Sequence, residues 1–485
     1  MIASPPSLED VLARVRQRLG VRPTRDDLVV RGRVEHLGSL GTFTWRFGPR
    51  GSFVRTVDAS TKRMVGASEH RSWVAEGNAP VRDLEWGEVD EARLLAAVLS
   101  GAWLDPSSGV SASLLPEGRV RLVLGRGQGE LTLDPATGEP RRIVILSSFA
   151  ESTWRFSDYE SFAGVVYPKL VEQDLPAGVV NRFEVVSVTR EPSIPEDFEA
   201  PAGAPSARFH PGVPSEVAVE RLPLPNAFLI VRPEIDGRAI GAFIFDTGAG
   251  ANVISPRAAL TLGLPTIGAS WLGLAAGASS GTVRQAQSMQ LGPITIDRPA
   301  FVEMDLDPLS AISGVEIVGI VGYDVLRRSI VEIEVAAPRL AIFDPATPQD
   351  ESAPWQPIVV YRNHVYASAR FEGHEGWFRL DTGAPQVPII FNGPAVERLS
   401  LLEGRGAQEA QIEVPGGTMD VAIGEIDGFE LAGHVFGPLA ALFPKRSAGA
   451  FADREALGNL GQDCMAPFRA RFDYRRKRAA FVKRG

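Results

Sequence analysis

The sequence predicts a mainly β protein with more than one domain. Its 485 residues correspond to three domains at about 150 residues each. The 49 Gly and 37 Pro favour many turns. Short alternating runs, such as 41–47, 118–124 and 129–133, favour strands with one solvent-facing side. The 44% of apolar residues is enough to build packed cores.

Charge and cysteine content exclude several classes of protein. The 50 basic and 59 acidic residues give a net charge of −9, which argues against a nucleic-acid-binding surface. The single cysteine, Cys464, rules out a disulfide framework and a thiolate metal cluster, and we expect it to be a small packed side chain. The six His show no metal-ligand spacing. We therefore expect no metal and no cofactor.

The first 190 residues predict an antiparallel sheet with a few helices. Apolar residues at helical spacing from Leu8 to Leu19, followed by Gly20, predict one amphipathic helix. A second helix is expected between Asp90 and Leu99. The alternating runs on either side of it predict the strands.

The chain carries no run of about 18 apolar residues, so no transmembrane segment is predicted. Residues 1–10 have neither a basic nor an apolar leader region, so we expect no signal peptide in this chain. This leaves two alternatives open. The protein stays in the cytoplasm, or it is exported and its leader has been trimmed.

Pro-rich segments divide the chain. Six prolines lie between Glu191 and Ser215, which predicts a semi-rigid linker at 191–215. A second Pro-rich stretch runs from Pro345 to Pro357. We therefore expect an N-terminal domain at 1–190, followed by two segments at 216–348 and 349–485.

Those two segments repeat each other. Asp246-Thr247-Gly248-Ala249 and Asp381-Thr382-Gly383-Ala384 are separated by 381 − 246 = 135 residues. Gly319-Ile320-Val321-Gly322-Tyr323-Asp324 corresponds to Gly458-Asn459-Leu460-Gly461-Gln462-Asp463, with an offset of 461 − 322 = 139. Each half then ends in a predicted hairpin, 330–343 in the first and 468–482 in the second. We expect Asp324 and Asp463 to cap short helices.

The repeat supports acid–base chemistry by a pair of carboxyls. In each copy an apolar strand runs into Asp-Thr-Gly, which delivers a carboxylate at a buried strand end. A pseudo-two-fold would bring Asp246 and Asp381 together. Two such carboxylates cannot both ionise cheaply, so they share one proton. One can then accept a proton from water while the other donates one to a carbonyl oxygen.

On these motifs, residues 216–485 resemble the aspartic peptidases, and the short halves are similar to retropepsins and their bacterial relatives. The resemblance implies a bilobal pair of β-barrels in which Asp246 and Asp381 are catalytic. It implies that Thr247 and Gly248 grip Thr382 and Gly383 between the loops. Retropepsins reach two lobes by dimerising, whereas this chain carries both, so we expect a monomer with an internal pseudo-dimer that acts on peptide or protein substrates.

The resemblance also implies Gly-rich flaps over the substrate. The candidates contain Gly277 and Gly281 in the first half and Gly416 and Gly417 in the second. Two features depart from the family pattern. Asn459 is polar where the family usually has an apolar residue, and Pro385-Gln386 follows the second Asp-Thr-Gly-Ala.

The N-terminal domain is similar in outline to bacterial lipoprotein-carrier (lipoprotein-sorting) domains. A leading helix is followed by a long antiparallel meander that contains Trp45, Trp73, Trp86, Trp103 and Trp154. The resemblance implies a cavity for an apolar or lipid-like ligand and favours an exported bacterial protein. Two functions follow from the sequence: an aspartic endopeptidase, or an inactive peptidase-like protein whose N-terminal domain binds an apolar ligand.

Overall fold

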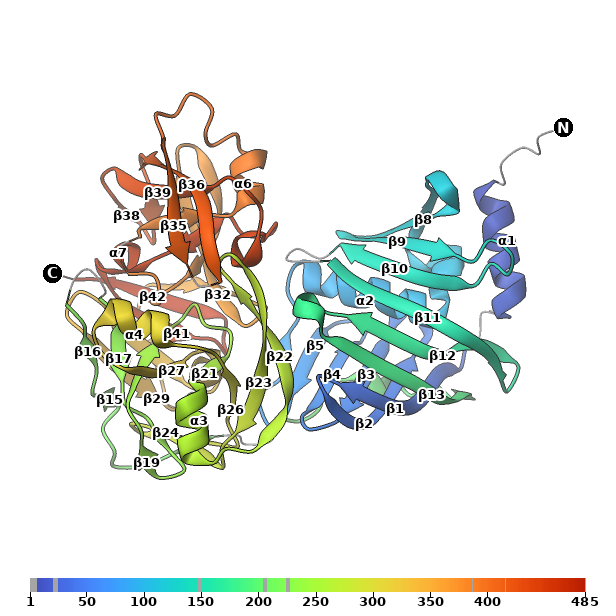
Figure 1. Ribbon diagram of the computed structural model, residues 1–485, viewed down its shortest axis with the longest axis horizontal. Coiled ribbons are helices and arrows are strands. Elements are labelled where there is room, and N and C mark those ends of the chain that lie inside the picture. Colours follow the sequence, from blue (N-terminus) through green and yellow to red (C-terminus); the bar gives the residue numbers. More distant parts are fainter. Residues whose placement is uncertain are drawn as a thin grey trace. The chain divides into compact units, whose positions relative to one another are not determined.

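The computed structural model describes residues 7–20, 25–146, 151–203, 207–223, 227–385, 387–414 and 416–484. The chain divides into two compact units, Met1–Gly203 and Ala204–Gly485 (Figure 1). Both are built mainly of β-strands, as the sequence predicts. None of the described helices is long and apolar enough to cross a membrane.

The N-terminal unit is one 13-stranded antiparallel sheet with the order β6-β5-β4-β3-β2-β1-β13-β12-β11-β10-β9-β8-β7. Two meanders thus meet where β1 pairs with β13. The strands are β1 (Asp27–His36), β2 (Ser39–Phe47), β3 (Phe53–Asp58), β4 (Lys62–Ala67), β5 (Ser72–Glu76), β6 (Arg82–Asp83), β7 (Ser111–Leu114), β8 (Val120–Leu124), β9 (Gly127–Leu133), β10 (Pro140–Leu146), β11 (Glu151–Phe162), β12 (Val165–Asp174) and β13 (Val180–Glu191).

Two α-helices accompany this sheet, α1 (Leu8–Leu19) and α2 (Gly87–Ser100). Ser7 caps α1 by accepting from the backbone N–H of Asp10, whose side chain accepts from Ser7 in return. Gly20 ends the helix in the left-handed conformation, with φ of 63°. The predicted helix at 8–19 is confirmed, and the second begins three residues before the predicted Asp90.

The Pro-rich segment 191–215 spans the division between the units. Its first part belongs to the N-terminal unit, where Phe198 is buried against Trp73 and accepts a hydrogen bond from the indole Nε1 of Trp73 at 3.1 Å. Its last part enters the C-terminal unit, where β14 (Ala207–Phe209) pairs with β25 (Ile294–Asp297). The division into four parts, with boundaries at 190, 215 and 348, remains a prediction.

The first half of the C-terminal unit forms two sheets. The five-stranded sheet has the order β14-β25-β24-β18-β19, and the eight-stranded sheet has the order β16-β17-β20-β27-β21-β26-β23-β22. The further elements are β16 (Glu220–Arg221), β17 (Leu229–Val231), β18 (Glu234–Ile235), β19 (Arg238–Ala239), β20 (Ala242–Phe245), β21 (Asn252–Ile254), α3 (Pro256–Leu262), β22 (Thr266–Leu274), β23 (Gly277–Gln285), β24 (Ser288–Leu291), β26 (Ala300–Glu303), α4 (Asp307–Ser313), β27 (Ile317–Val321) and α5 (Tyr323–Leu326).

The second half forms a ten-stranded sheet with the order β35-β36-β39-β34-β40-β33-β32-β37-β38, and β31 pairs with β32. Its elements are β31 (Val359–Tyr361), β32 (His364–Phe371), β33 (His374–Leu380), β34 (Ile389–Phe391), α6 (Gly393–Arg398), β35 (Gln408–Val414), β36 (Gly417–Ile426), β37 (Glu430–Leu431), β38 (His434–Val435), β39 (Leu439–Pro444), β40 (Gly458–Leu460) and α7 (Gln462–Met465).

A six-stranded sheet joins the two halves, with the order β15-β29-β28-β41-β42-β30. Its strands are β15 (Glu216–Val217), β28 (Ile330–Glu334), β29 (Arg339–Phe343), β30 (Trp355–Pro357), β41 (Phe468–Asp473) and β42 (Arg478–Lys483). The two predicted hairpins, β28–β29 and β41–β42, are both present, and they pair with each other through β28 and β41. Within the described residues no sheet closes on itself, so the expected β-barrels are open sheets. The last hairpin of each half pairs in the shared six-stranded sheet and not in the main sheet of its own half, so it does not close that sheet.

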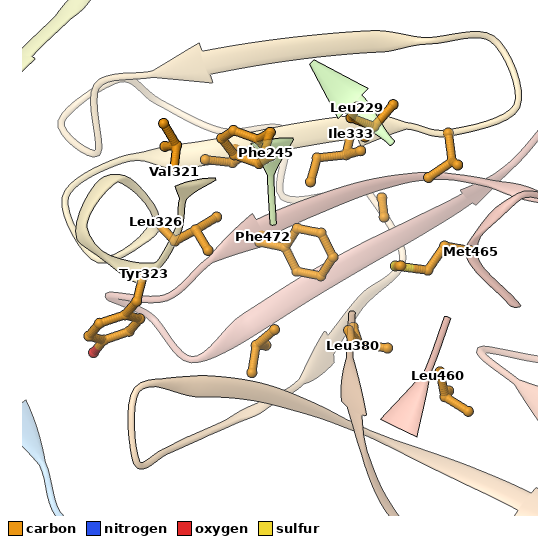
Figure 2. Packing of buried hydrophobic residues seen from close by; sticks show 14 of the residues in the cluster. Leu229, Phe245, Val321, Tyr323, Leu326, Ile333, Leu380, Leu460, Met465 and Phe472 are labelled. Atoms are coloured by element: carbon orange, nitrogen blue, oxygen red, sulfur yellow. The ribbon is translucent and has the colours of Figure 1, made fainter. Parts of the chain in front are cut away.

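One hydrophobic core spans both halves (Figure 2). Residues at equivalent positions of the repeat belong to it: Phe245 and Leu380, Val321 and Leu460, Leu326 and Met465, and Ile333 and Phe472. Most of these side chains are completely buried. Equivalent residues of the two copies of the repeat therefore share one core.

Candidate active site

Each Asp-Thr-Gly motif begins where a strand ends. All four residues of β20 are buried, and Asp246 follows them directly. The strand lies parallel to β27, and the backbone N–H of Asp246 donates to Val321 O at 2.9 Å. In the second half β33 lies parallel to β40, and Asp381 donates to Leu460 O, also at 2.9 Å. Matching strand pairs thus hold the two aspartates.

Thr247 and Thr382 join the two loops by four buried hydrogen bonds. The Oγ1 of Thr247 donates to Leu380 O at 2.8 Å and accepts from the N–H of Thr382 at 3.0 Å. The Oγ1 of Thr382 donates to Phe245 O at 3.0 Å and accepts from the N–H of Thr247 at 3.0 Å. Both threonines are almost completely buried, with exposed fractions of 1% and 0%. Because the bonds are reciprocal, each loop fixes the position of the other.

Gly248 and Gly383 leave room for the opposing carboxyls. A Cβ atom at Gly248 would collide with the carboxyl of Asp381, and one at Gly383 would collide with the carboxyl of Asp246. The backbone N–H groups of both glycines instead donate to Asp246 Oδ1, at 2.7 and 3.1 Å. The N–H of Gly383 also donates to Asp381 Oδ1 at 2.9 Å. A residue with a side chain would not fit at either position.

The two carboxyls lie within hydrogen-bonding reach of each other in a buried site. Burial, followed by the charge of Asp381, raises the pKa of Asp246 well above its ordinary value. A close pair of this kind holds one proton between two carboxyls over a wide range of pH. It can therefore accept one proton and donate another in a single step.

The second carboxyl has polar neighbours that the first lacks. Asn459 Nδ2 donates to Asp381 Oδ2 at 2.5 Å, and Arg379 Nε donates to Asn459 Oδ1 at 2.6 Å. The sequence prediction did not include Arg379. The signal for it was a lone arginine in the apolar run Trp377-Phe378-Arg379-Leu380, where the first copy has Ile244.

The loop that contains Pro385 keeps the backbone bonds of its counterpart. Ala384 donates to Asp381 O at 3.4 Å and accepts from Gln462 at 3.0 Å. In the first copy Ala249 donates to Asp246 O at 3.3 Å and accepts from Tyr323 at 2.9 Å. The loop geometry is thus retained up to Pro385, and Gln386 lies outside the described residues.

The flap candidates lie on two hairpins whose tips approach each other. Gly277 begins β23 at the tip of β22–β23, and Gly281 lies within β23 opposite Ser270. Gly416 and Gly417 lie at the tip of β35–β36, next to Pro415, which is outside the described residues. A Cβ atom at Gly416 would lie 2.9 Å from the Cβ of Leu274 in the other hairpin.

Asp324 and Asp463 do not cap helices, contrary to the prediction. The N-cap residues of α5 and α7 are Gly322 and Gly461, and neither cap has a side-chain hydrogen bond. Asp324 is buried and forms ion pairs with Arg327 and Arg328. Burial opposes its ionisation, but the two guanidiniums outweigh this and hold the pKa of Asp324 below its ordinary value. The prediction failed because each helix starts two residues earlier than a capping aspartate would require.

Cys464 is buried, and its Sγ lies 3.2 Å from Pro388 O. Burial raises its pKa, so it is a packed thiol rather than a thiolate. Among the residues that the structure describes, no group of three or more His, Cys, Asp or Glu side chains could hold a metal ion.

Comparisons with known proteins agree with this geometry in the first half of the C-terminal unit. No curated protein matches the chain. A crystal structure of a LolA superfamily protein from Nitrosomonas europaea is similar, with 11% sequence identity and a TM-score of 0.29 over 40% of this chain and 99% of that chain. Residues 231–325 match the aspartyl protease family. This stretch contains Asp246-Thr247-Gly248 and ends within α5, so the region that carries the first motif is aspartic-protease-like.

Proposed function

We propose that the C-terminal unit is an aspartic endopeptidase with Asp246 and Asp381 as its catalytic pair. The observation that carries the proposal is the convergence of two carboxyls from two copies of one loop, in a buried site where the pKa of Asp246 is raised. The family match of residues 231–325 supports the first copy. The reciprocal threonine bonds support the second, because they give both loops the same geometry.

In the proposed reaction, water is held between the two carboxyls. The ionised carboxylate accepts a proton from the water, whose oxygen attacks the carbonyl carbon of the peptide bond. The protonated carboxyl donates its proton to the carbonyl oxygen, so the tetrahedral intermediate is neutral. The C–N bond then breaks as the carboxyl that took the proton from water gives it to the leaving amine nitrogen. The other carboxyl takes back a proton from a hydroxyl of the intermediate, which becomes the carboxylic acid product. One water is consumed, and no covalent enzyme intermediate forms.

Cleavage of a mixed peptide library from pH 3 to 8 tests this proposal. Asp246→Asn and Asp381→Asn should each reduce kcat/KM by about 10²–10⁴-fold, the usual contribution of an acid–base group. Asp463→Asn is the matched control, because Asp463 is an exposed carboxyl of the same repeat and should tolerate the change. Wild-type rates in both dyad variants would contradict the assignment. Because one chain supplies both carboxyls, we expect the activity to belong to the monomer.

An apolar pocket in the N-terminal unit favours ligand binding as a second candidate function. Its lining includes Leu19 of α1, Leu99 of α2 and Phe156 of β11, and Tyr167 and Arg190 add polar groups. The pocket is small, so it would hold only one end of an apolar or lipid-like molecule, such as a short apolar group beside a polar one. Together with an inactive dyad, this would make the protein a binding protein rather than a peptidase.

Mass spectrometry of apolar molecules extracted from the purified full chain tests the second function. Leu99→Trp should fill the pocket and reduce the bound amount, whereas Val186→Trp, at an exposed position of the same unit, should not. Equal amounts of ligand in all three proteins, or none in any of them, would contradict binding in this pocket.

A further inference from the structure

The two lobes differ in one row of side chains beside the aspartates. In the first lobe the register places Ile230 opposite Ile244, and Ile244 opposite Ile320, across β17, β20 and β27. All three are buried in an apolar cluster. In the second lobe the same row runs across β32, β33 and β40, and it holds Tyr366, Arg379 and Asn459. The register makes these positions equivalent, so the difference is a substitution of polar for apolar groups and not a shift of the strands.

The polar row reaches Asp381 directly. Arg379 Nη2 lies 4.0 Å from Asp381 Oδ2, and the two side chains are only 11% and 14% exposed. Asn459, with an exposed fraction of 2%, bridges them through its amide. At the equivalent positions Ile244 and Ile320 offer Asp246 neither a charge nor a hydrogen-bond donor. Asp246 receives hydrogen bonds from the backbone N–H groups of Gly248 and Gly383.

Arg379 determines which way the amide of Asn459 points. A guanidinium can only donate hydrogen bonds, so the atom of Asn459 that faces Arg379 Nε must be the carbonyl oxygen Oδ1. The amide nitrogen Nδ2 then faces Asp381 Oδ2, and this nitrogen can only donate. An oxygen that accepts from Nδ2 is best left without a proton of its own. The charge of Arg379 and the hydrogen bond from Asn459 therefore both favour the ionised form of Asp381.

We propose that Arg379 and Asn459 are positioning residues that keep the negative charge on Asp381 and the shared proton on Asp246. The assignment of roles rests on the proposed peptidase function. Asp381 would accept the proton from water while the O–H bond of the water breaks and its oxygen bonds to the carbonyl carbon. Asp246 would give its proton to the carbonyl oxygen as the C=O π bond opens.

Other titratable groups surround this row and modulate the effect. Asp453 accepts from the hydroxyl of Tyr366 at 3.4 Å, and burial raises the pKa of Asp453 to about 6. Arg362 and Arg379 both oppose that rise. Below about pH 6 Asp453 is neutral, so the positive charge of Arg379 attracts mainly Asp381. Above about pH 6 Asp453 is a carboxylate, and Arg379 attracts both carboxylates. Burial also raises the pKa of Tyr474, so its phenol stays neutral.

Titration of each carboxyl alone tests the assignment without requiring cleavage. Full-length protein labelled with ¹³C at the aspartate Cγ is titrated as Asp246→Asn and as Asp381→Asn, and the double variant identifies the remaining signal. The Asp381 carboxyl should titrate at least about one pH unit below the Asp246 carboxyl, because a cation within about 4–6 Å lowers a carboxyl pKa by about 1–3 units. Equal values, or the reverse order, would overturn the proposal.

The lobe 1 residues supply the variants that test the mechanism. In the Asp246→Asn background, Arg379→Ile/Asn459→Ile rebuilds the apolar row of the first lobe and should raise the pKa of Asp381 by about one unit or more. Arg379→Lys keeps the positive charge and should leave the Asp381 titration close to that of the parent Asp246→Asn protein. The same Ile pair in the Asp381→Asn background should move Asp246 less. If the Ile pair moves neither carboxyl, or if Arg379→Lys behaves like it, the proposal is wrong.

The pH profile of kcat/KM gives a second readout. Loss of a cation beside the dyad disfavours each ionisation, so both limbs of the profile should move to higher pH by about one unit in the Ile pair. A purely structural role would lower the rate without moving the limbs, and that outcome would overturn the proposal. Absence of cleavage by wild type would contradict the peptidase function alone, because the carboxyl titration would still decide where the proton resides.

Discussion

Removal of one threonine hydroxyl should loosen both active-site loops by a similar amount. Thr247→Val keeps the shape of the side chain but removes two buried hydrogen bonds, leaving Leu380 O and the Thr382 N–H without their partner. A buried polar group that loses its partner costs about 1–3 kcal/mol. The expected loss in the local stability of the loops is therefore about 2–6 kcal/mol. Thr382→Val removes the two matching bonds and should cost about the same.

Hydrogen–deuterium exchange of peptides that cover the two loops measures this loss. Local exchange is suited to the purpose because two units need not unfold as one. The loop peptides of both lobes should exchange faster in either variant, and kcat/KM should fall in parallel. Thr261→Val is the control, since its hydroxyl makes a bond to Arg257 O at an exposed site. Faster exchange in one loop only, or a large asymmetry between the two variants, would refute the reciprocal grip.

Two further predictions concern buried charges. Glu332 is 4% exposed and accepts a hydrogen bond from Arg471 Nε at 2.9 Å. Glu332→Ala should destabilise the C-terminal unit by about 3 kcal/mol, as measured by urea unfolding. The double variant Glu332→Arg/Arg471→Glu should recover part of this loss. Failure of the exchange to recover any stability would mean that the pair does not act as a unit. Burial raises the pKa of Asp453 in the folded state from 3.8 to about 6. The folded state therefore binds more protons than the unfolded state between these values. The free energy of unfolding should fall by up to about 3 kcal/mol as pH rises from about 4 to about 6. Asp453→Asn should flatten this dependence, and an unchanged slope in the variant would show that another group is responsible.

Local patterns predicted the elements that depend on local interactions. The helix at 8–19 was predictable because its capping residue, its apolar spacing and its terminal glycine all lie within one short segment. The two closing hairpins were predictable from the repeat. The same repeat indicated which loops converge, since equal sequences fold alike and pack about a common axis.

Features that depend on contacts between distant residues were not predictable. Arg379 lies next to Asn459 because β33 and β40 are parallel neighbours, and nothing in either segment alone indicates that pairing. The prediction of the helix caps was wrong for a different reason. The sequence pattern located the short helix at α5 but not its first residue, Tyr323. The last hairpins of the two halves pair with each other in a shared open sheet, and this pairing is again a long-range property.

Two copies of a repeat in one chain can differ from each other, whereas two identical chains in a dimer cannot. In the sheet that joins the lobes, Glu332 pairs with Arg471, and 471 − 332 = 139 is the offset of the repeat. The pseudo-two-fold axis therefore passes through this pair. In a dimer of two identical first lobes, Glu332 would face its own copy, and two buried carboxylates would repel each other.

The same argument applies at the aspartates. Identical lobes would give both carboxyls the same neighbours, so any preference for one site of the proton would have to come from the substrate. Here the row of Ile244 and Ile320 in one lobe and of Arg379 and Asn459 in the other makes the carboxyls unequal before any substrate binds. Under the proposed function, these unequal neighbours would assign the acid and the base before a substrate binds. If the carboxyl titration gives equal pKa values for the two sites, this assignment fails, and the polar row must have a purely structural role.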